Sequence, residues 1–276
     1  MTLMKNILYG FISGITEFLP VSSRGHQALM RYILGTETSN PILDLMVHIG
    51  VIIALFVCCR ETIRRLLREQ RTTVRSRRKR NRSLDSRSLY DLRLLKTAAF
   101  PLTVGLLLSV TTKEWGSNLL VLVGFFALNA IFLLLAEHSW RGNRDSRTMT
   151  GLDGIIMGIA GAASAFPGIS RTGMISAYAI ARGADTQNSA NWATLLGIPA
   201  LLFAVGFDIF SLISFGVSAI TFSAIAAAFA AGLAGFCGGY IGISLFLAVM
   251  NHSGFSPFAY YSFGAALFSF ALYLIT

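Results

Sequence analysis

Charged side chains are scarce in this sequence. Only 13% of its 276 residues are Asp, Glu, Lys or Arg, and 54% are hydrophobic, whereas roughly a quarter of the residues of a soluble domain are charged. The mean hydropathy is +0.63. This shortage of charge excludes a soluble globular domain and predicts an integral membrane protein.

Cysteine is rare as well, and its three positions form no pattern. Cys58, Cys59 and Cys237 all lie in apolar stretches and lack the spacing of metal ligands. Neither a disulfide framework nor a cysteine metal centre is indicated, and the three side chains are expected to serve in packing.

Long apolar runs are abundant. Six of them approach or exceed the roughly 20 residues that a helix needs to cross a bilayer. Helices are predicted because the strands of a membrane barrel would be short and alternating. The sequence therefore predicts an all-α polytopic membrane protein. The runs cover residues 43–59, 94–110, 119–136, 191–213, 220–238 and 256–275.

Basic residues gather between Arg60 and Lys96, where fourteen Lys or Arg residues accompany four acids. The densest run, RSRRKRNR at 75–82, contains no aromatic residue, which argues against a nucleic-acid partner. By the positive-inside rule, the loop at 60–93 is expected in the cytoplasm. A second basic stretch, RGNRDSR at 141–147, follows two spans later and agrees with this orientation.

Two segments of the chain match when the sequence is shifted by 147 residues. The shift places the P-x-x-S-R pattern that starts at Pro20 on the same pattern starting at Pro167, and it also aligns Gly14 with Gly161. Each copy is followed by about three spans. We therefore predict an internal repeat within one transmembrane domain, with a first repeat at 1–140 and a second at 150–276.

The predicted orientation makes the two repeats inverted. The first copy approaches from the extracytoplasmic side and the second from the cytoplasm, as in transporters whose broken helices meet near the midplane. The hairpins, at 4–35 and 151–183, contain a proline at the turn, and neither half is long enough to span. We interpret both as re-entrant helix pairs whose turns are covered by protein.

Polar residues collect at the two expected turns. Ionisable residues at membrane depth are functional candidates because they are costly to insert unless they are paired. Arginine binds phosphate oxygens through two donors, hydroxyls add further donors, and a carboxylate can hold a divalent cation. A lipid-linked phosphate is the expected ligand. The candidates are Glu17, Ser22, Ser23, Arg24, His26, Ser170, Arg171 and Thr172.

Structural interpretations of these residues stay open at this point. Glu17 and Arg24 could form an ion pair that locks the hairpin, and His26 could be a hydrogen-bonded packing residue. Ser22 and Thr172 could serve only as helix caps. Three further polar residues in or beside the spans could face the same cavity, namely Asp44, His48 and Asp208.

The motifs resemble a known family. GITEFLPVSSRGH and FPGISRTG are similar to the two signature motifs of the undecaprenyl-diphosphate phosphatase family, also called the bacitracin-resistance proteins. LDLMVHIGVIIALF, LLGIPAL and FSPFAYY extend the resemblance over nearly the whole chain. It implies hydrolysis of undecaprenyl diphosphate to undecaprenyl phosphate and phosphate, which recycles the lipid carrier for peptidoglycan synthesis and confers bacitracin resistance.

The resemblance also implies roles for residues. Ser23 would attack the terminal phosphorus, and His26 would move protons. Glu17 would help to hold a divalent cation, Mg²⁺ or Ca²⁺. Arg171 would balance phosphate charge, with Ser170 beside it in the motif. The family further implies a multi-pass protein of the bacterial plasma membrane with a site that opens to the extracytoplasmic side.

The sequence departs from the family at four positions. Ser13 stands where an acid or amide is expected, Gly161 and His48 each replace Gln, and Ile175 replaces Thr. Arg24 could compensate for lost charge. These departures keep an alternative function open, a transporter or flippase for undecaprenyl phosphate or a related polyprenyl lipid. The oligomeric state is also open, with a homodimer as one alternative.

Overall fold

The structure is a computed structural model that describes residues 3–35, 41–78, 87–139, 142–215 and 222–276. All named elements in this part of the chain are helices. Its longer helices are α3 (Pro41–Cys58), α4 (Arg60–Arg78), α5 (Arg87–Leu106), α7 (Leu119–Glu137), α11 (Gly197–Phe215), α12 (Phe222–His252) and α13 (Ser256–Ile275). The shorter ones are α1 (Leu3–Phe18), α2 (Ser23–Leu34), α6 (Leu108–Thr111), η1 (Lys113–Ser117), α8 (Gly151–Ala162), η2 (Ala163–Ala165), α9 (Arg171–Ala181) and α10 (Thr186–Leu195).

Six helical stretches within the described ranges are long and apolar enough to cross a membrane. They confirm the predicted all-α polytopic membrane protein. The stretches are Pro41–Cys58, Leu89–Thr111, Leu119–Glu137, Thr186–Ser214, Ser223–His252 and Ser256–Ile275. Parts of two predicted segments, 79–86 of the basic loop and 220–221 of the fifth run, lie outside the described residues, as does Arg141 of the second basic stretch.

Two spans differ from the predicted runs. The run at 191–213 is broken after Leu195, where α10 ends and α11 begins at Gly197. Pro199 follows in the first turn of α11, and it cannot donate the backbone hydrogen bond that a continuous helix would need. The helix predicted to end at residue 238 continues to His252, so α12 has 31 residues. Its glycines do not stop it, because neighbouring helices pack tightly against them.

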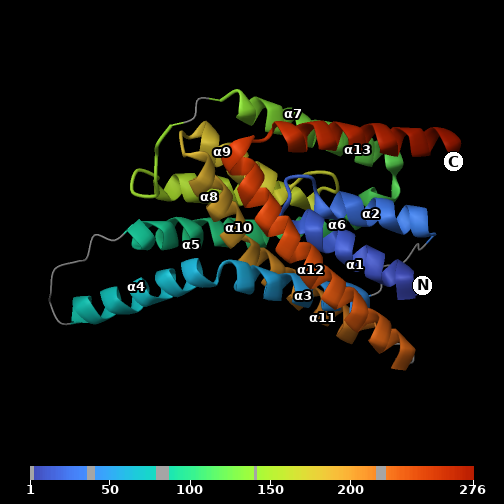
Figure 1. Cartoon of the computed structure of the whole chain (residues 1–276), viewed down its shortest axis with the longest axis horizontal. Coiled ribbons are helices and arrows are strands. Elements are labelled where there is room, and N and C mark those ends of the chain that lie inside the picture. Colours follow the sequence, from blue (N-terminus) through green and yellow to red (C-terminus); the bar gives the residue numbers. More distant parts are fainter. Residues whose placement is uncertain (1–2, 36–40, 79–86, 140–141, 216–221) are drawn as a thin grey trace.

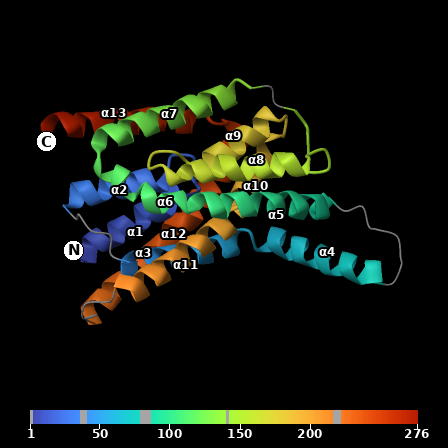
Figure 2. The same cartoon turned by 180° about the vertical axis from the view of Figure 1, so that it is seen from behind.

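The helices lie roughly side by side (Figures 1 and 2). α7 and α13 pack together along one flank, α3 and α11 lie on the opposite flank, and the two short helix pairs α1–α2 and α8–α9 lie between them. α12 crosses this arrangement diagonally (Figure 1). Both termini lie at one end of the molecule, and the basic helix α4 extends at the other end.

Glycines allow the short pairs to approach the spans closely. A Cβ atom at Gly14 of α1 would collide with the backbone oxygen of Gly235 in α12, and one at Gly238 would collide with that of Phe11. In the same way, a Cβ at Gly158 of α8 would meet the backbone of Ala98 in α5. Small residues that let backbones touch are a common basis of helix association in membranes.

The end of the α8–α9 pair opposite its turn is held together by an ion pair between Asp153 and Arg182. Thr150 and Asp153 form a capping box at the start of α8. The Asp153 carboxylate also accepts hydrogen bonds from Arg182 Nε at 2.7 Å and from the Tyr178 hydroxyl at 3.1 Å. One buried carboxylate therefore joins the first turn of α8 to the last turn of α9 and directs the turn at 163–170 into the bundle.

We expect Gly238→Val to destabilise the protein, because the added side chain cannot fit against the α1 backbone. Overpacking of this kind costs about 1–3 kcal/mol. The midpoint of thermal unfolding in detergent should fall. Gly264→Val in α13 is the matched control, because a Cβ there has no neighbour within 4 Å. Equal midpoints for the two variants would contradict this packing.

Candidate active site

The turns of the two helix pairs meet and exchange hydrogen bonds. The Ser22 hydroxyl accepts the backbone N–H of Gly168 at 3.0 Å, and the Ser170 hydroxyl donates to the Leu19 carbonyl at 3.3 Å. Ser22 has a φ of 70°, a left-handed conformation that is uncommon for a residue other than glycine. Two segments about 146 residues apart in sequence thus form one interlocked centre.

Asn129 of α7 holds both turns at once. Its Nδ2 donates to the Pro20 carbonyl at 3.0 Å and to the Ser262 hydroxyl at 3.1 Å. Its Oδ1 accepts the backbone N–H of Ser170 at 2.9 Å. The side chain is fully buried. Asn129 was not predicted from the sequence, although a lone amide inside the apolar run 119–136 is a signal that could have identified it.

Glu17 joins the two halves of the centre through its two carboxylate oxygens. Arg171 Nη2 donates to Oε1 at 3.2 Å, and the Ser23 hydroxyl donates to Oε2 at 2.5 Å. Arg171 is only 6% exposed, and among the described residues its Nη1 has no hydrogen-bond partner. A buried guanidinium that has a free donor and shares a carboxylate with a serine hydroxyl is suited to binding a phosphate oxygen.

Arg24 makes its hydrogen bonds away from the Glu17 carboxylate. Its guanidinium donates to the carbonyl oxygen of Ala165 and, at 3.2 Å, to that of Ser109. The alternative ion pair between Glu17 and Arg24 is therefore wrong, because the partner of Glu17 comes from the other helix pair. Arg24 instead anchors the start of α2 to the turn at 163–170 and to α6.

His26 is held away from Ser23. Its Nδ1 lies 2.8 Å from the Ser22 carbonyl oxygen, and its Nε2 lies 2.8 Å from the hydroxyl of Tyr261 in α13. Both ring nitrogens are thus engaged. In this arrangement the group that can accept the Ser23 proton is Glu17.

The predicted caps are divided between two serines. Ser22 caps α2 through the N–H of Gly25, and Ser170 caps α9 through the N–H of Gly173. Thr172 is not the cap. Its hydroxyl is fully buried and lies 3.1 Å from that of Ser170, so it orients the capping side chain.

The three further polar candidates form separate pairs. His48 Nδ1 lies 2.6 Å from Asp208 Oδ2, which links α3 to α11. Asp44 accepts a hydrogen bond from the Tyr9 hydroxyl at 2.7 Å and lies 3.5 Å from Arg31 Nη2. These pairs compensate buried charge between helices.

The side chains at the turns do not fit a protein-held divalent cation. In the described part of the chain, no three His, Cys, Asp or Glu residues are placed to hold a metal ion. In the ranges that the structure describes, Glu17 is the one carboxylate at the turns, and each of its oxygens accepts a hydrogen bond, from Ser23 and from Arg171. One helical turn earlier lies Ser13, whose buried hydroxyl has no hydrogen-bond partner among the described residues and carries no charge.

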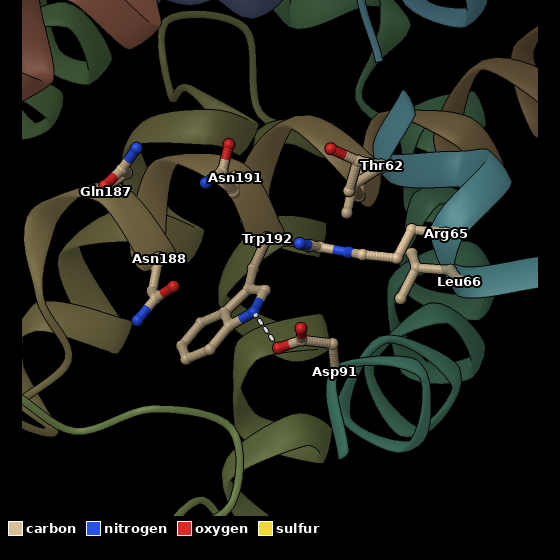
Figure 3. Close-up of a pocket in the computed structure, with 9 residues that line it drawn as sticks. Thr62, Arg65, Leu66, Asp91, Gln187, Asn188, Asn191 and Trp192 are labelled. Atoms are coloured by element: carbon tan, nitrogen blue, oxygen red, sulfur yellow. Dashed lines mark hydrogen bonds between the residues drawn. The ribbon is translucent and has the colours of Figure 1, made fainter. Parts of the chain in front are cut away.

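A surface hollow of about 200 Å³ lies apart from this centre, where α4, α5 and α10 meet. In Figure 3, Arg65 points into it toward Trp192, whose indole N–H donates to Asp91 at 3.0 Å. A carboxylate on its wall makes the hollow a poor phosphate site. No candidate residue from the sequence lines it.

Comparison with known proteins identifies the family. The sequence profile described as bacitracin resistance protein BacA matches residues 6–268. This chain belongs to that family. The match covers α2, α8, α9 and all of α1 from residue 6 on, and it includes every residue of the interlocked centre.

Curated relatives of this chain carry one activity in their names. Undecaprenyl-diphosphatase 3 of Bacillus cereus is 25% identical over 97% of this chain and 96% of its own length. The undecaprenyl-diphosphatase of Carboxydothermus hydrogenoformans is 29% identical over 77% and 76%, respectively. That of Campylobacter curvus is 27% identical over 95% of each chain.

We expect Asn129→Ala to lower the thermal unfolding midpoint strongly. The substitution leaves the Ser170 N–H and the Pro20 carbonyl buried without a partner, at about 1–3 kcal/mol for each group. Leu128→Ala is the control from the same helix, because that side chain is 37% exposed. The role of Asn129 in joining the two turns is refuted if Asn129→Ala is no less stable than Leu128→Ala.

Proposed function

We propose that this protein hydrolyses undecaprenyl diphosphate to undecaprenyl phosphate and inorganic phosphate. The observation that carries the proposal is the buried Arg171, whose free Nη1 lies in the same cluster as the Ser23–Glu17 pair. The family match and the names of the relatives supply the substrate. Return of the lipid carrier to peptidoglycan synthesis and resistance to bacitracin follow from this activity.

The geometry supports a covalent route. Glu17 takes the proton of the Ser23 hydroxyl as its oxygen attacks the terminal phosphorus, and Arg171 stabilises the charge on the phosphoryl oxygens. The bond to the bridging oxygen breaks, and undecaprenyl phosphate leaves. Water then attacks the phosphorus of the phosphoserine, the bond to the Ser23 oxygen breaks, Glu17 returns its proton to that oxygen, and phosphate leaves with the protons of the water. Ser170 and Thr172 orient the turn from which Arg171 extends, and Ser22 and Arg24 fix the opposite turn.

The Mg²⁺ or Ca²⁺ expected from the resemblance has no part in this route. Glu17 is the carboxylate that would hold it, and its oxygens are already bonded to Ser23 and Arg171. The cofactor stays a prediction that these side chains do not support.

We further propose that the protein lies in a bacterial plasma membrane with α4 on the cytoplasmic side. The basic residues of α4 favour this orientation, and the α1–α2 pair then approaches the centre from the extracytoplasmic side. Packing supports the inverted repeat, since α1 lies against α12 as α8 lies against α5, and α7 lies against α13. The homodimer stays a prediction.

The lipid transporter is not favoured as an alternative. Its warrant was the inverted-repeat architecture together with the thinned acid motif, which fits a site that binds a phosphate without activating a nucleophile. The hydrogen bond from Ser23 to Glu17 supplies a base for such a nucleophile, and the relatives are named as diphosphatases.

The first test is phosphate release from undecaprenyl diphosphate by purified protein in detergent. Loss of a preorganised donor costs roughly a hundredfold to a thousandfold in kcat. The kcat of Arg171→Ala should therefore be lower than that of the unmodified protein by at least that factor. Arg64→Ala on exposed α4 should retain full turnover. Bound lipid without turnover in the unmodified protein would overturn the hydrolase.

Glu17→Gln tests the assignment of the base. The amide keeps the shape of the side chain but cannot accept a proton from Ser23, and general base catalysis contributes roughly a hundredfold or more. We expect kcat to fall further in Glu17→Gln than in His26→Asn. The opposite order would reassign the base to His26.

A further inference from the structure

The hydrogen bonds of His26 determine which nitrogen carries its proton. The Ser22 carbonyl oxygen, 2.8 Å from Nδ1, can only accept. Nδ1 therefore carries the hydrogen. In the neutral ring, Nε2 then holds a lone pair, and the hydroxyl of Tyr261 donates to it at 2.8 Å.

The imidazole ring is also held by two aromatic rings. Tyr261 stacks on it with ring centroids 5.5 Å apart and an interplanar angle of 18°. Phe126 meets it edge-on at 5.4 Å. His26 is 8% exposed, whereas Tyr261 is 51% exposed. The ring position therefore depends on a residue at the outside of the bundle, more than 230 positions away in sequence.

We propose that Tyr261 is a positioning residue for the phosphatase centre, which holds His26 Nε2 by a hydrogen bond from its hydroxyl. A hydroxyl both donates and accepts, so the same contact satisfies Nε2 when it is neutral and when it has taken a proton. Through His26 Nδ1 and the Ser22 carbonyl oxygen, Tyr261 holds the turn from which Ser23 extends. The catalytic part of this inference rests on the proposed function, but the hydrogen bond does not.

The neighbouring Tyr260 provides a matched control. It lies one position earlier in α13 and is 68% exposed, and in the described part of the chain its hydroxyl makes no hydrogen bond to His26. Removal of either hydroxyl deletes one oxygen atom from the same helix. Only Tyr261→Phe deletes the donor to Nε2.

The hydrogen bond is tested by ¹⁵N NMR of histidine-labelled protein in detergent. The chain has four histidines, and His26→Asn identifies the resonances of His26. In Tyr261→Phe, we expect the chemical shift of Nε2 to move to the value of an unprotonated nitrogen that accepts no hydrogen bond. The shift of Nδ1 should remain that of a protonated nitrogen. An Nε2 resonance that is the same in Tyr261→Phe and Tyr260→Phe overturns the proposal, whether or not the protein is active.

Kinetics test the positioning role. Because the Tyr261 hydroxyl contacts His26 and not the reacting atoms, Tyr261→Phe should lower kcat about tenfold, less than the hundredfold or more that general acid–base catalysis contributes. KM should change little, and Tyr260→Phe should match the unmodified protein. In a His26→Asn background, Tyr261→Phe should cause no further loss, because Tyr261 acts through His26.

Two kinetic results would overturn the positioning role. One is a further fall in kcat when Tyr261→Phe is added to His26→Asn, which would show an effect independent of the ring. The other is equal kcat in Tyr261→Phe and Tyr260→Phe. If the unmodified protein releases no phosphate, the proposed function fails, and the NMR result alone decides whether the contact exists.

Discussion

The need to satisfy backbone polar groups at the two broken helix pairs is the constraint on which this structure depends. The turns are buried inside the bundle, where each backbone N–H or carbonyl group left unpaired is costly. Here the side chains of Ser22, Ser170 and Asn129 supply the partners. The turns can therefore exist only when they are in contact, and contact creates the centre.

Close helix packing makes this contact achievable. α1 reaches the centre because the glycines of α1 and α12 let their backbones touch, and α8 reaches it along α5 in the same way. Larger side chains at these positions would separate the helices and withdraw the turns from each other. The glycines of α12 thus affect the centre indirectly, because they let α1 approach closely enough for Glu17 to reach Arg171.

The charges at the centre are balanced, but one hydrogen-bond donor remains unused. Glu17 neutralises Arg171 and accepts a hydrogen bond from the Ser23 hydroxyl. Arg171 nevertheless retains one nitrogen without a hydrogen-bond partner among the described residues. A fully satisfied guanidinium would be a structural feature. The free donor, on a guanidinium that shares Glu17 with the Ser23 hydroxyl, makes the centre receptive to an anion.

The sequence by itself determined the membrane-spanning helices, the two polar turns and the family. Spans follow from hydropathy and length, which are local properties, and the P-x-x-S-R repeat is visible in the letters. Only the tertiary structure decided the partners: Glu17 with Arg171 instead of Arg24, His26 with Tyr261 instead of Ser23, and Asn129 between the turns. Such pairings join residues between 41 and 235 positions apart, and they depend on how helices pack, which no local pattern encodes.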